Sequence, residues 1–297
     1  SVSTWTVNNM YATTLSKGRV FCMGDAVHRH PPSNGLGSNT SIQDGFNLAW
    51  KLAMVLKGQA GAGLLDSYQA ERAPVAKQIV TRANKSIEEF GPIFKSLGLL
   101  DSVDPVKMQQ NMDARCNDTD DAERQRAAIR EAIASKVYEF DAHGVEMNHR
   151  YASNAVVKDD QPEPKFEKDA ELHFQPTSWP GARVPHVWLF GQNGEKISSL
   201  DLTGHGVFTI LTGIGGDGWQ AAAKAVAKEF GIQINAHKIG PRQVWQDLTG
   251  DWARAREIRD AGALLVRPDH HVAWRAEAAV PDAEGELRRV LKTVLDR

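Results

Sequence analysis

The segment from Arg19 to Leu52, RVFCMGDAVHRHPPSNGLGSNTSIQDGFNLAWKL, says most about the fold of this chain. It opens with a short apolar run, Arg19–Met23, whose length and β-branched and aromatic content predict a buried strand. The run ends at Gly24-Asp25, and a loop rich in Gly, Pro and Asn follows. A helix is predicted after the loop, over about residues 40–57. A strand, a loop and a helix in this order are typical of an α/β fold.

The predicted helix carries apolar residues at steps of three and four, which predicts that this face is buried. These positions are Ile42, Phe46, Ala49, Ala53 and Leu56. Asn39 stands just before the helix and is a good N-cap residue. The loop is therefore expected to direct backbone N–H groups and the positive end of the helix dipole toward one place. Such an arrangement suits an anion or a polarised carbonyl.

Asp25 and two glycines make the loop a candidate binding site. An acidic residue at the carboxyl end of a strand in an α/β sheet lies where ligands bind. The Asp25 carboxylate can accept hydrogen bonds from sugar hydroxyls, whereas it would repel a phosphate. Gly35 and Gly37 allow a flat ligand to approach the backbone closely. An ordinary strand-turn-helix connection is the alternative for an isolated Gly-x-Gly, but here all the features follow one another within residues 19–52.

The rest of the first half is predicted to be mostly helical, after a half-exposed strand over Val2–Tyr11. A short helix is expected over Leu64–Arg72, and a longer one that Pro74 begins, ending near Leu97. Asp104-Pro105 marks another helix start. The charged stretch over about residues 118–140 is predicted to be a helix with a solvated face. Its expected apolar stripe is Ala127, Ile129, Ile133 and Val137.

The composition changes near residue 157, which indicates a domain boundary. The stretch Asp159–Lys168 is polar, contains two prolines and is typical of a linker. Beyond it the pattern alternates between strands and helices. Strands are predicted over Val187–Phe190, Val207–Leu211, Gln233–Lys238, Ala263–Arg267 and Val272–Arg275, and helices over Trp219–Phe230 and Glu284–Leu295. The sequence therefore predicts two units, residues 1–157, which are mostly helical after the opening strands, and residues 158–297, which are α/β.

Composition excludes several classes of protein. The 297 residues carry a net charge of -2, which argues against nucleic acid as a partner. Cys22 and Cys116 are too few for a disulfide framework or a Cys-rich zinc site. No apolar run approaches the roughly 20 residues of a membrane span, and no signal-peptide pattern is present. We expect a cytoplasmic protein without membrane contact.

At this point the motifs resemble those of a known family. Gly24-Asp25-Ala26, Pro31-Pro32 and the Gly-x-Gly-x-Asn of residues 35–39, followed by Asn47-Leu48-Ala49-Trp50-Lys51-Leu52, resemble the second FAD motif of class A flavoprotein aromatic hydroxylases. Two further stretches fit the phenol hydroxylase subgroup of that family. These are Tyr68-x-x-Glu71-Arg72-x-Pro74 and Ala263–Arg275, which reads ALLVRPDHHVAWR. The resemblance covers nearly the whole chain. It implies an α/β fold in which residues 1–157 are the C-terminal part of a Rossmann-like FAD-binding domain with a helical extension.

The resemblance implies a role for each residue of the loop. Asp25 would hold the ribityl or ribose hydroxyls of FAD, and Pro32 would lie at the edge of the flavin. Gly35 would let the backbone come close, while Gly37, Ser38 and Asn39 would offer N–H groups to the pyrimidine end of the ring. Leu36 and Ser38 stand where many members of the family carry Gln and Met or Leu. Because backbone groups would bind the ring, these two departures are expected to change the wall of the pocket and not the contacts with the flavin.

The resemblance also implies the reaction. NADPH would reduce FAD, and O2 would then hydroxylate a phenolic or chlorophenolic substrate ortho to its hydroxyl. The family's Gly-x-Gly-x-x-Gly unit and Asp-Gly motif have no counterpart before residue 24, so we expect this chain to be the C-terminal portion of such an enzyme and inactive alone. The catalytic residues are unknown and are expected in the absent part. A homo-oligomer formed through the C-terminal domain is expected.

Two alternatives remain open from the residues alone. One is a related flavin hydroxylase that acts on another aromatic or polyketide substrate. The other is a non-catalytic assembly module that keeps a vestigial FAD motif.

The second unit is expected to be thioredoxin-like, as in the phenol hydroxylase subgroup. No cysteine follows Cys116, so the unit lacks the Cys-x-x-Cys that redox work requires. Gly213–Gly218 reads GIGGDG and matches a dinucleotide-binding pattern, but no acid follows at the expected distance, and a glycine-rich strand-to-helix turn is favoured. No metal site is predicted from His28, His30 or the His270-His271 pair, whose adjacent side chains would point to opposite faces of a strand.

Overall fold

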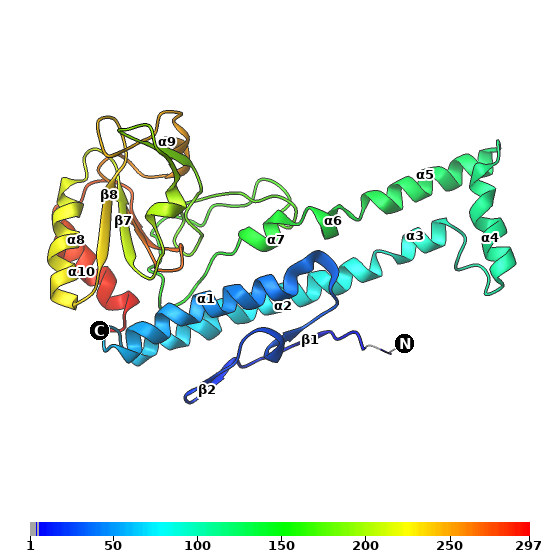
Figure 1. Ribbon diagram of the computed structural model, residues 1–297, viewed down its shortest axis with the longest axis horizontal. Coiled ribbons are helices and arrows are strands. Elements are labelled where there is room, and N and C mark those ends of the chain that lie inside the picture. Colours follow the sequence, from blue (N-terminus) through cyan, green and yellow to red (C-terminus); the bar gives the residue numbers. More distant parts are fainter. Residues whose placement is uncertain (1–3, 5) are drawn as a thin grey trace.

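The computed structural model describes Thr4 and residues 6–297, which form two parts in Figure 1. The first part is built on a long antiparallel pair of helices, α1 (Leu36–Leu56) and α2 (Asp66–Glu88). The second is a mixed α/β domain above the end of the pair where α1 stops and α2 starts. Among the residues that the structure describes, no helix is both long and apolar enough to cross a membrane.

The segment before α1 forms small hairpin-like pairs instead of a buried strand. Its elements are β1 (Met10–Tyr11), β2 (Ser16–Lys17), β3 (Val20–Phe21), the 3-10 turn η1 (Gly24–Ala26), β4 (His28–Arg29) and the 3-10 turn η2 (Ser33–Gly35). β1 pairs with β4 and β2 with β3, both antiparallel. The predicted buried strand over Arg19–Met23 is wrong, because β3 has β2 as its partner and Val20 is 65% exposed. The predicted strand Val2–Tyr11 lies partly outside the described residues, and β1 is its described strand.

Helix α1 differs from its prediction at its start and in its buried face. It begins at Leu36 after the N-cap Gly35, whose φ of 62° is favourable for glycine, so Asn39 is not the N-cap. The apolar face predicted to be buried is exposed: Ile42 is 69% and Leu56 is 79% exposed. The opposite face is buried and is made of Asp44, Asn47, Leu48, Trp50, Lys51 and Met54. Tertiary contacts with α2 and with the second domain decide which face is covered.

Helix α2 runs through Pro74, so the predicted helix start at this proline is wrong. Buried side chains on both sides of the proline, including Tyr68 and Ile79, hold the helix continuous across the missing N–H. Shorter helices follow: α3 (Gly91–Ser96), α4 (Pro105–Asp113), η4 (Ala114–Cys116), α5 (Asp120–Ala134), α6 (Val137–Phe140) and α7 (His143–Met147). The predicted start at Asp104-Pro105 is confirmed, since the Asp104 carboxylate accepts a hydrogen bond from the Val106 N–H.

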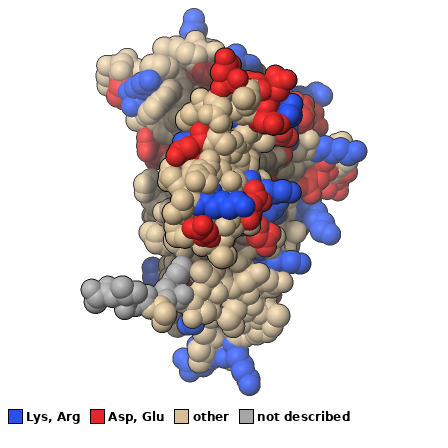
Figure 2. All heavy atoms as spheres, turned by 90° about the vertical axis from the view of Figure 1, so that its right-hand side faces the viewer, with Lys and Arg blue, Asp and Glu red and all other residues tan. Residues whose placement is uncertain are grey.

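The α4–α5 end of the molecule is a charged, solvated surface. Arg126 pairs with Glu123 and Arg130 reaches the same carboxylate at 3.3 Å. Figure 2 shows acidic and basic side chains interspersed over this end. The prediction of a solvated helix face is confirmed. Its predicted apolar stripe is wrong in part, because Ile133 is 54% exposed while Ala122 and Ala132 are the buried residues of α5.

The second part is the predicted thioredoxin-like domain. Its elements are β5 (Trp188–Gly191), β6 (Lys196–Ser198), η5 (Ser199–Leu202), β7 (Phe208–Thr212), α8 (Asp217–Phe230), β8 (Ile234–Lys238), β9 (Trp245–Gln246), α9 (Asp251–Ala255), β10 (Ala263–Val266), β11 (Val272–Ala276) and α10 (Ala283–Val294). The central sheet has the order β11-β10-β7-β8. β7 and β8 are parallel and joined through α8, and the other pairs are antiparallel. The glycine-rich stretch Gly213–Gly218 forms the turn between β7 and α8, at residues 213–216, and the first two residues of α8, as favoured from the sequence.

One hydrophobic cluster contains residues of both parts. Helices α8 and α10 pack together against one face of the sheet, where Trp219, Leu265 and Leu291 are buried. Trp50 and Met54 from the C-terminal half of α1 belong to the same cluster. A second cluster around Trp252 covers the other face of the sheet. The position of α1 against the thioredoxin-like domain is therefore fixed by packing.

Candidate functional site

Five of the six predicted cofactor-contacting residues line one groove at the N-terminal end of α1. Asp25, Pro32, Gly35, Gly37 and Ser38 border a hollow of about 440 Å³. The remaining walls come from residues that the sequence analysis did not select, namely Asn8, His28, Arg29, His30 and Pro31. The loop between η1 and α1 thus brings its acidic residue, its prolines and its glycines to a common surface.

Asn39, the sixth predicted residue, lies elsewhere. It borders a different hollow, together with Leu36 and Ile42. Its side-chain amide donates a hydrogen bond to the Gly35 carbonyl at 2.9 Å. The backbone N–H of Asn39 is also engaged. Because Gly35 is the N-cap, Asn39 carries the first backbone N–H that has a hydrogen-bond acceptor inside the helix. Its predicted contact with the flavin remains a prediction that this geometry does not favour.

The groove offers the donors and acceptors that a flat, polyhydroxylated anion requires. The N–H groups of Gly37 and Ser38 lie in the first turn of α1, where an α-helix supplies no internal acceptor. The 21-residue helix adds the positive end of its dipole at the same place. Asp25 presents an exposed carboxylate that can accept from hydroxyl groups. The chemistry of this donor set fits the FAD that the resemblance implies.

Two histidines at the groove lie on top of each other. The rings of His28 and His30 are stacked with centroids 6.1 Å apart. Burial lowers the pKa of His30, and its Nδ1 lies 2.7 Å from the Pro31 carbonyl oxygen. A neutral ring whose Nδ1–H donates to that carbonyl satisfies both observations. The ring of His30 also lies 3.7 Å from the position that a Cβ on Gly37 would take, so it forms the floor beside the first turn of α1.

A buried carboxylate under the groove holds its shape. Asp44 Oδ2 accepts hydrogen bonds from the Gly24 N–H and from His28 Nε2, both at 3.1 Å, while Oδ1 accepts from Arg72 Nε at 2.7 Å. Burial alone would raise the pKa of Asp44, but His28 and Arg72 outweigh it and the pKa is lowered. The ionised carboxylate of Asp44 therefore holds the turn η1, which contains Asp25, against α1.

A separate network of buried charges joins α1 and α2 to the second domain. Glu71 receives Lys51 Nζ at 2.8 Å and a bidentate pair of bonds from Arg267, whose Nη1 and Nη2 lie 2.6 and 2.9 Å from its two oxygens. Arg267 also forms two bonds with Asp269, at 3.0 and 2.6 Å. Glu71, Lys51 and Arg267 have fully buried side chains. These opposite charges balance one another, so the network is satisfied without solvent.

The network explains the motifs that gave rise to the resemblance. Asp44, Asn47 and Lys51 come from α1, Glu71 and Arg72 from α2, and Arg267 and Asp269 from the turn between β10 and β11. Their spacing in α1, steps of three and four, places them on one helix face. The apolar residues of α1 satisfy the same periodicity, so the spacing alone does not distinguish the buried polar set from the exposed apolar set. The motif outside the loop thus serves as an interdomain clamp.

Comparisons with known proteins agree with this arrangement. Residues 1–83 match the family model described as FAD binding domain, and residues 177–297 match the model described as aromatic-ring hydroxylase, C-terminal. The two matched regions are the two parts that the buried network joins. The chain belongs to the class A FAD-dependent aromatic hydroxylase family, as predicted, and corresponds to a C-terminal portion of its members.

Within that family the chain is similar to phenol hydroxylases. It is 54% identical over 297 residues to the 2,4-dichlorophenol 6-monooxygenase of Cupriavidus pinatubonensis, covering 100% of this chain and 50% of that protein. It is 51% identical to the phenol 2-monooxygenase of a Pseudomonas species, covering 97% and 47%. The crystal structure of the flavin-dependent monooxygenase PieE in complex with FAD and substrate superposes with a TM-score of 0.91 at 45% identity, covering 98% of this chain and 50% of that one. The chain therefore spans about half the length of the curated relatives it matches.

The turn at Gly24 provides a first test of the site. Gly24 has a φ of +60°, and a Cβ there would lie 2.9 Å from Ser41 Oγ, which itself donates to the Gly37 carbonyl. We expect Gly24→Ala to lower the free energy of unfolding by about 1–3 kcal/mol, because it adds backbone strain and displaces Ser41. Chemical denaturation of the chain measures this loss.

Gly18→Ala is the matched control for this substitution. Gly18 has the same φ of +60°, but a Cβ there meets nothing within 4 Å. The difference between the two variants isolates the contact with Ser41 from the backbone strain. Equal losses in both would contradict the role assigned to that contact.

Proposed function

We propose that this chain supplies the flavin-edge loop and the C-terminal domain of an FAD-dependent phenol monooxygenase. The observation that carries the proposal is the groove at the start of α1, where Asp25, Pro32, Gly35, Gly37 and Ser38 lie together. The relatives above 50% identity, whose names are those of phenol monooxygenases, support the same conclusion.

In this proposal each part of the groove has a separate task. Asp25 accepts hydrogen bonds from the ribityl or ribose hydroxyls of FAD. The N–H groups of Gly37 and Ser38 bind the pyrimidine end of the flavin, and the positive end of α1 stabilises negative charge there. Pro32 directs its carbonyl toward the substrate. When bound, FAD supplies the redox chemistry, in which NADPH provides the electrons and O2 the oxygen atom.

We further propose that the substrate is a phenol or a chlorophenol and that it is hydroxylated ortho to its hydroxyl. Because the matched relatives are about twice as long, the site for the ADP part of FAD and the group that activates the phenol are proposed to lie in the half that this chain does not contain. A homo-oligomer through the thioredoxin-like domain and a cytoplasmic location are also proposed, the latter supported by the two free cysteines, Cys22 and Cys116.

The proposal is tested by joining this chain to the N-terminal half of the Cupriavidus pinatubonensis relative. We expect the chimaera to bind FAD and to hydroxylate 2,4-dichlorophenol with NADPH. Asp25→Ala in the chimaera should weaken FAD about tenfold or more, because hydrogen bonds to a charged carboxylate are lost. Flavin fluorescence during titration of the apoprotein measures the affinity.

Asp101→Ala provides the control, since Asp101 is also an exposed carboxylate but lies outside the groove. An unchanged FAD affinity in Asp25→Ala would overturn the role of this residue. A folded chimaera that binds no FAD and turns over no phenol would favour the non-catalytic assembly module. Turnover of a fused-ring aromatic polyketide in place of phenols would favour the other hydroxylase alternative.

A further inference from the structure

The flavin-edge loop, residues 31–38, contains two successive residues in the left-handed region of backbone conformation. Asn34 has a φ of 65°, and the N-cap Gly35 that follows it has a φ of 62°. This region is strained for a residue with a side chain, although asparagine tolerates it better than most residues do. Such a conformation persists only where surrounding contacts hold it in place. The contacts of Asn34 therefore indicate what shapes the loop.

Asn34 is held by helix α6, which lies far away along the chain. The Nδ2 atom of Asn34 donates hydrogen bonds to the backbone carbonyls of Tyr138 and Glu139, at 2.7 and 3.2 Å. A neutral amide suits this place, because its NH2 group carries two donors and can serve both carbonyls at once. Pro32 and Gly35, on either side of Asn34, border the groove at the start of α1. The amide thus ties the middle of the loop to α6, while its neighbours face the groove.

Helix α6 is fixed in turn by contacts on two sides. The Arg82 guanidinium lies 5.3 Å from the centre of the Tyr138 ring, and the Tyr138 hydroxyl donates to Asp169 Oδ2 at 2.8 Å. Lys136, directly before α6, is buried and donates to the Ser86 carbonyl at 2.6 Å. These contacts join α6 to α2 and to the stretch around Asp169. Because both hold α6, this helix is a firm support for the loop.

The residue after the turn is anchored to the same part of the chain by packing. Leu36, the first residue of α1, is 3% exposed and lies in a hydrophobic cluster with Ala142 and Val145. Val145 belongs to α7, and Ala142 lies between α6 and α7. The loop is therefore held at Asn34 by hydrogen bonds and at Leu36 by apolar packing, both against residues 138–145.

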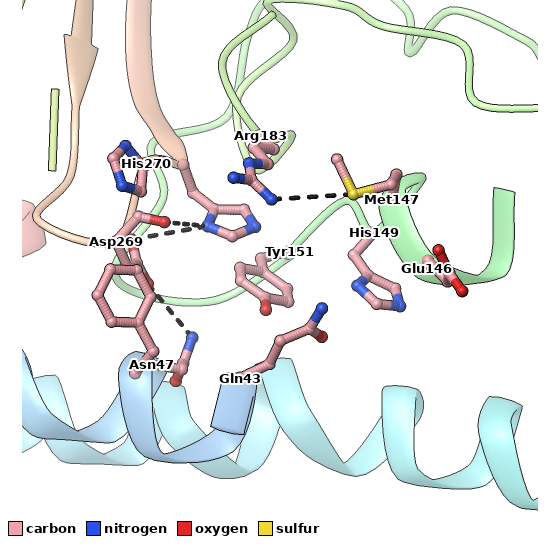
Figure 3. Close-up of a pocket in the computed structure, with 11 residues that line it drawn as sticks. Gln43, Asn47, Glu146, Met147, His149, Tyr151, Arg183, Asp269 and His270 are labelled. Atoms are coloured by element: carbon pink, nitrogen blue, oxygen red, sulfur yellow. Dashed lines mark hydrogen bonds and ion pairs between the residues drawn. The ribbon is translucent and has the colours of Figure 1, made fainter. Parts of the chain in front are cut away.

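The chain beyond α7 is also held against the helix pair. Figure 3 shows His149 and Tyr151 above α1, with Gln43 pointing toward them and Arg183 on the opposite side. These residues border a cavity of about 310 Å³, which shares no lining residue with the groove at the start of α1. The Tyr151 hydroxyl accepts a hydrogen bond from Arg72 Nη1 at 2.9 Å. The support behind the loop is thus fixed to α2 both before and after α7.

We propose that Asn34 is a positioning residue of the flavin-edge loop. Through its amide, α6 holds the loop in the shape that presents the free N–H groups of Gly37 and Ser38 to the flavin. The role toward the flavin rests on the proposed function, whereas the hold of α6 on the loop does not. A loop that already has its bound shape loses less conformational entropy when FAD binds. Removal of the amide is therefore expected to loosen the loop and, as a consequence, to weaken FAD.

Hydrogen exchange of this chain without flavin, followed by mass spectrometry, tests the hold of α6 on the loop. Asn34→Gly removes the amide and keeps positive φ accessible, so it isolates the two hydrogen bonds to α6. We expect exchange in the peptide that spans residues 31–38 to become about tenfold faster, because those bonds no longer oppose local opening. The Gly35 N–H, which donates to the Pro32 carbonyl at 3.2 Å, reports this opening. Exchange in β10 should stay as it is.

Asn154→Gly is the matched control for this substitution. The Asn154 amide also donates to a distant backbone carbonyl, that of Gly63 at 2.7 Å, but it lies outside the groove. This variant should leave exchange in residues 31–38 unchanged. Asn34→Asp keeps the size of the side chain and its tolerance of positive φ, but its carboxylate has no donor for the two carbonyls. It should loosen the loop at least as much as Asn34→Gly does.

The effect on the flavin is measured in the chimaera with the N-terminal half of the Cupriavidus pinatubonensis relative. Asn34→Gly should weaken FAD about tenfold and should shift the visible absorption bands of the bound flavin, because the N–H groups of Gly37 and Ser38 no longer have fixed positions. Asn154→Gly should change neither quantity. The absorption bands report the surroundings of the flavin ring, which a loss of general stability does not alter.

Several outcomes would overturn the proposal. Exchange in residues 31–38 that matches the unchanged chain in both Asn34 variants would show that α6 does not hold the loop. Equal acceleration in β10 would show a loss of global stability in place of local loosening. A looser loop with unchanged FAD affinity and absorption would show that the loop is not positioned for the flavin. A chimaera that binds no FAD even without a substitution would instead contradict the proposed function, and the exchange result on this chain would still decide whether α6 holds the loop.

Discussion

Arg267→Met is expected to lower the free energy of unfolding by about 3–5 kcal/mol, which is the usual cost of removing one partner from a buried ion pair. Arg267 is fully buried and pairs with Glu71 and Asp269 at 2.6 Å each. Its removal leaves two buried carboxylates without their arginine, and the remaining neighbours Lys51, Asn47 and Ser153 compensate them only in part. Denaturant unfolding of the chain measures the loss.

A double variant shows whether the loss comes from the pair itself. Combining Glu71→Gln with Arg267→Met should cost less than the sum of the two single substitutions, because the neutral amide no longer needs the guanidinium. Arg288→Met removes a partly exposed arginine that pairs with Glu229 and Glu284 at the surface, and it should change stability little. Strict additivity of the buried variants would contradict the clamp between the two parts.

Acid is expected to unfold this chain steeply below about pH 4.5. Burial would raise the pKa values of Glu71 and Asp269, but Arg267 outweighs burial, and both pKa values lie well below their ordinary range. The pKa of Asp44 is also lowered, because His28 and Arg72 outweigh its burial. A carboxyl whose pKa is lower in the folded state contributes its full stability above the ordinary value, 4.5 for Glu or 3.8 for Asp, and loses it as the pH falls further. Each such group contributes at most about 1.4 kcal/mol per pH unit to the slope of the free energy of unfolding against pH.

Asp44→Asn isolates one of these carboxyl groups. The free energy of unfolding of this variant, measured by denaturation at several pH values from neutral to about pH 3, should fall less steeply than that of the unchanged chain. Asp101→Asn, at an exposed position, should leave the slope as it is. Parallel slopes for the unchanged chain and for Asp44→Asn would show that Asp44 is not held ionised by His28 and Arg72.

The second domain was predictable from the sequence because its pattern is local. Short β-branched and aromatic runs alternate with an amphipathic helix, and β7, α8, β8, β10 and β11 all lie within a residue or two of their predicted bounds. The loop at residues 24–38 was also predictable as a binding loop, since the order of its Asp, Pro and Gly residues is the motif that indicates it. Five of the six selected residues meet at one groove for that reason.

The first part was harder to predict because its elements depend on distant contacts. Helix α1 has two faces with the same periodicity, one apolar and one rich in polar residues, and the sequence analysis chose the apolar one. The polar face is the buried one, because α2 supplies the opposite charges: Glu71 pairs with Lys51, and Arg72 pairs with Asp44. No periodicity within α1 records the presence of those partners, which belong to another helix.

The sequence by itself determined the family, the thioredoxin-like topology and the loop that faces the proposed flavin, because those properties are encoded by residue order over short segments. The tertiary structure alone decided the buried face of α1, the clamp through Glu71 and Arg267, and the cavity around Arg183. Each of these requires side chains from at least three separate segments. Burial makes the arrangement possible, since a charge can stay in the interior only where the fold brings its partner to it.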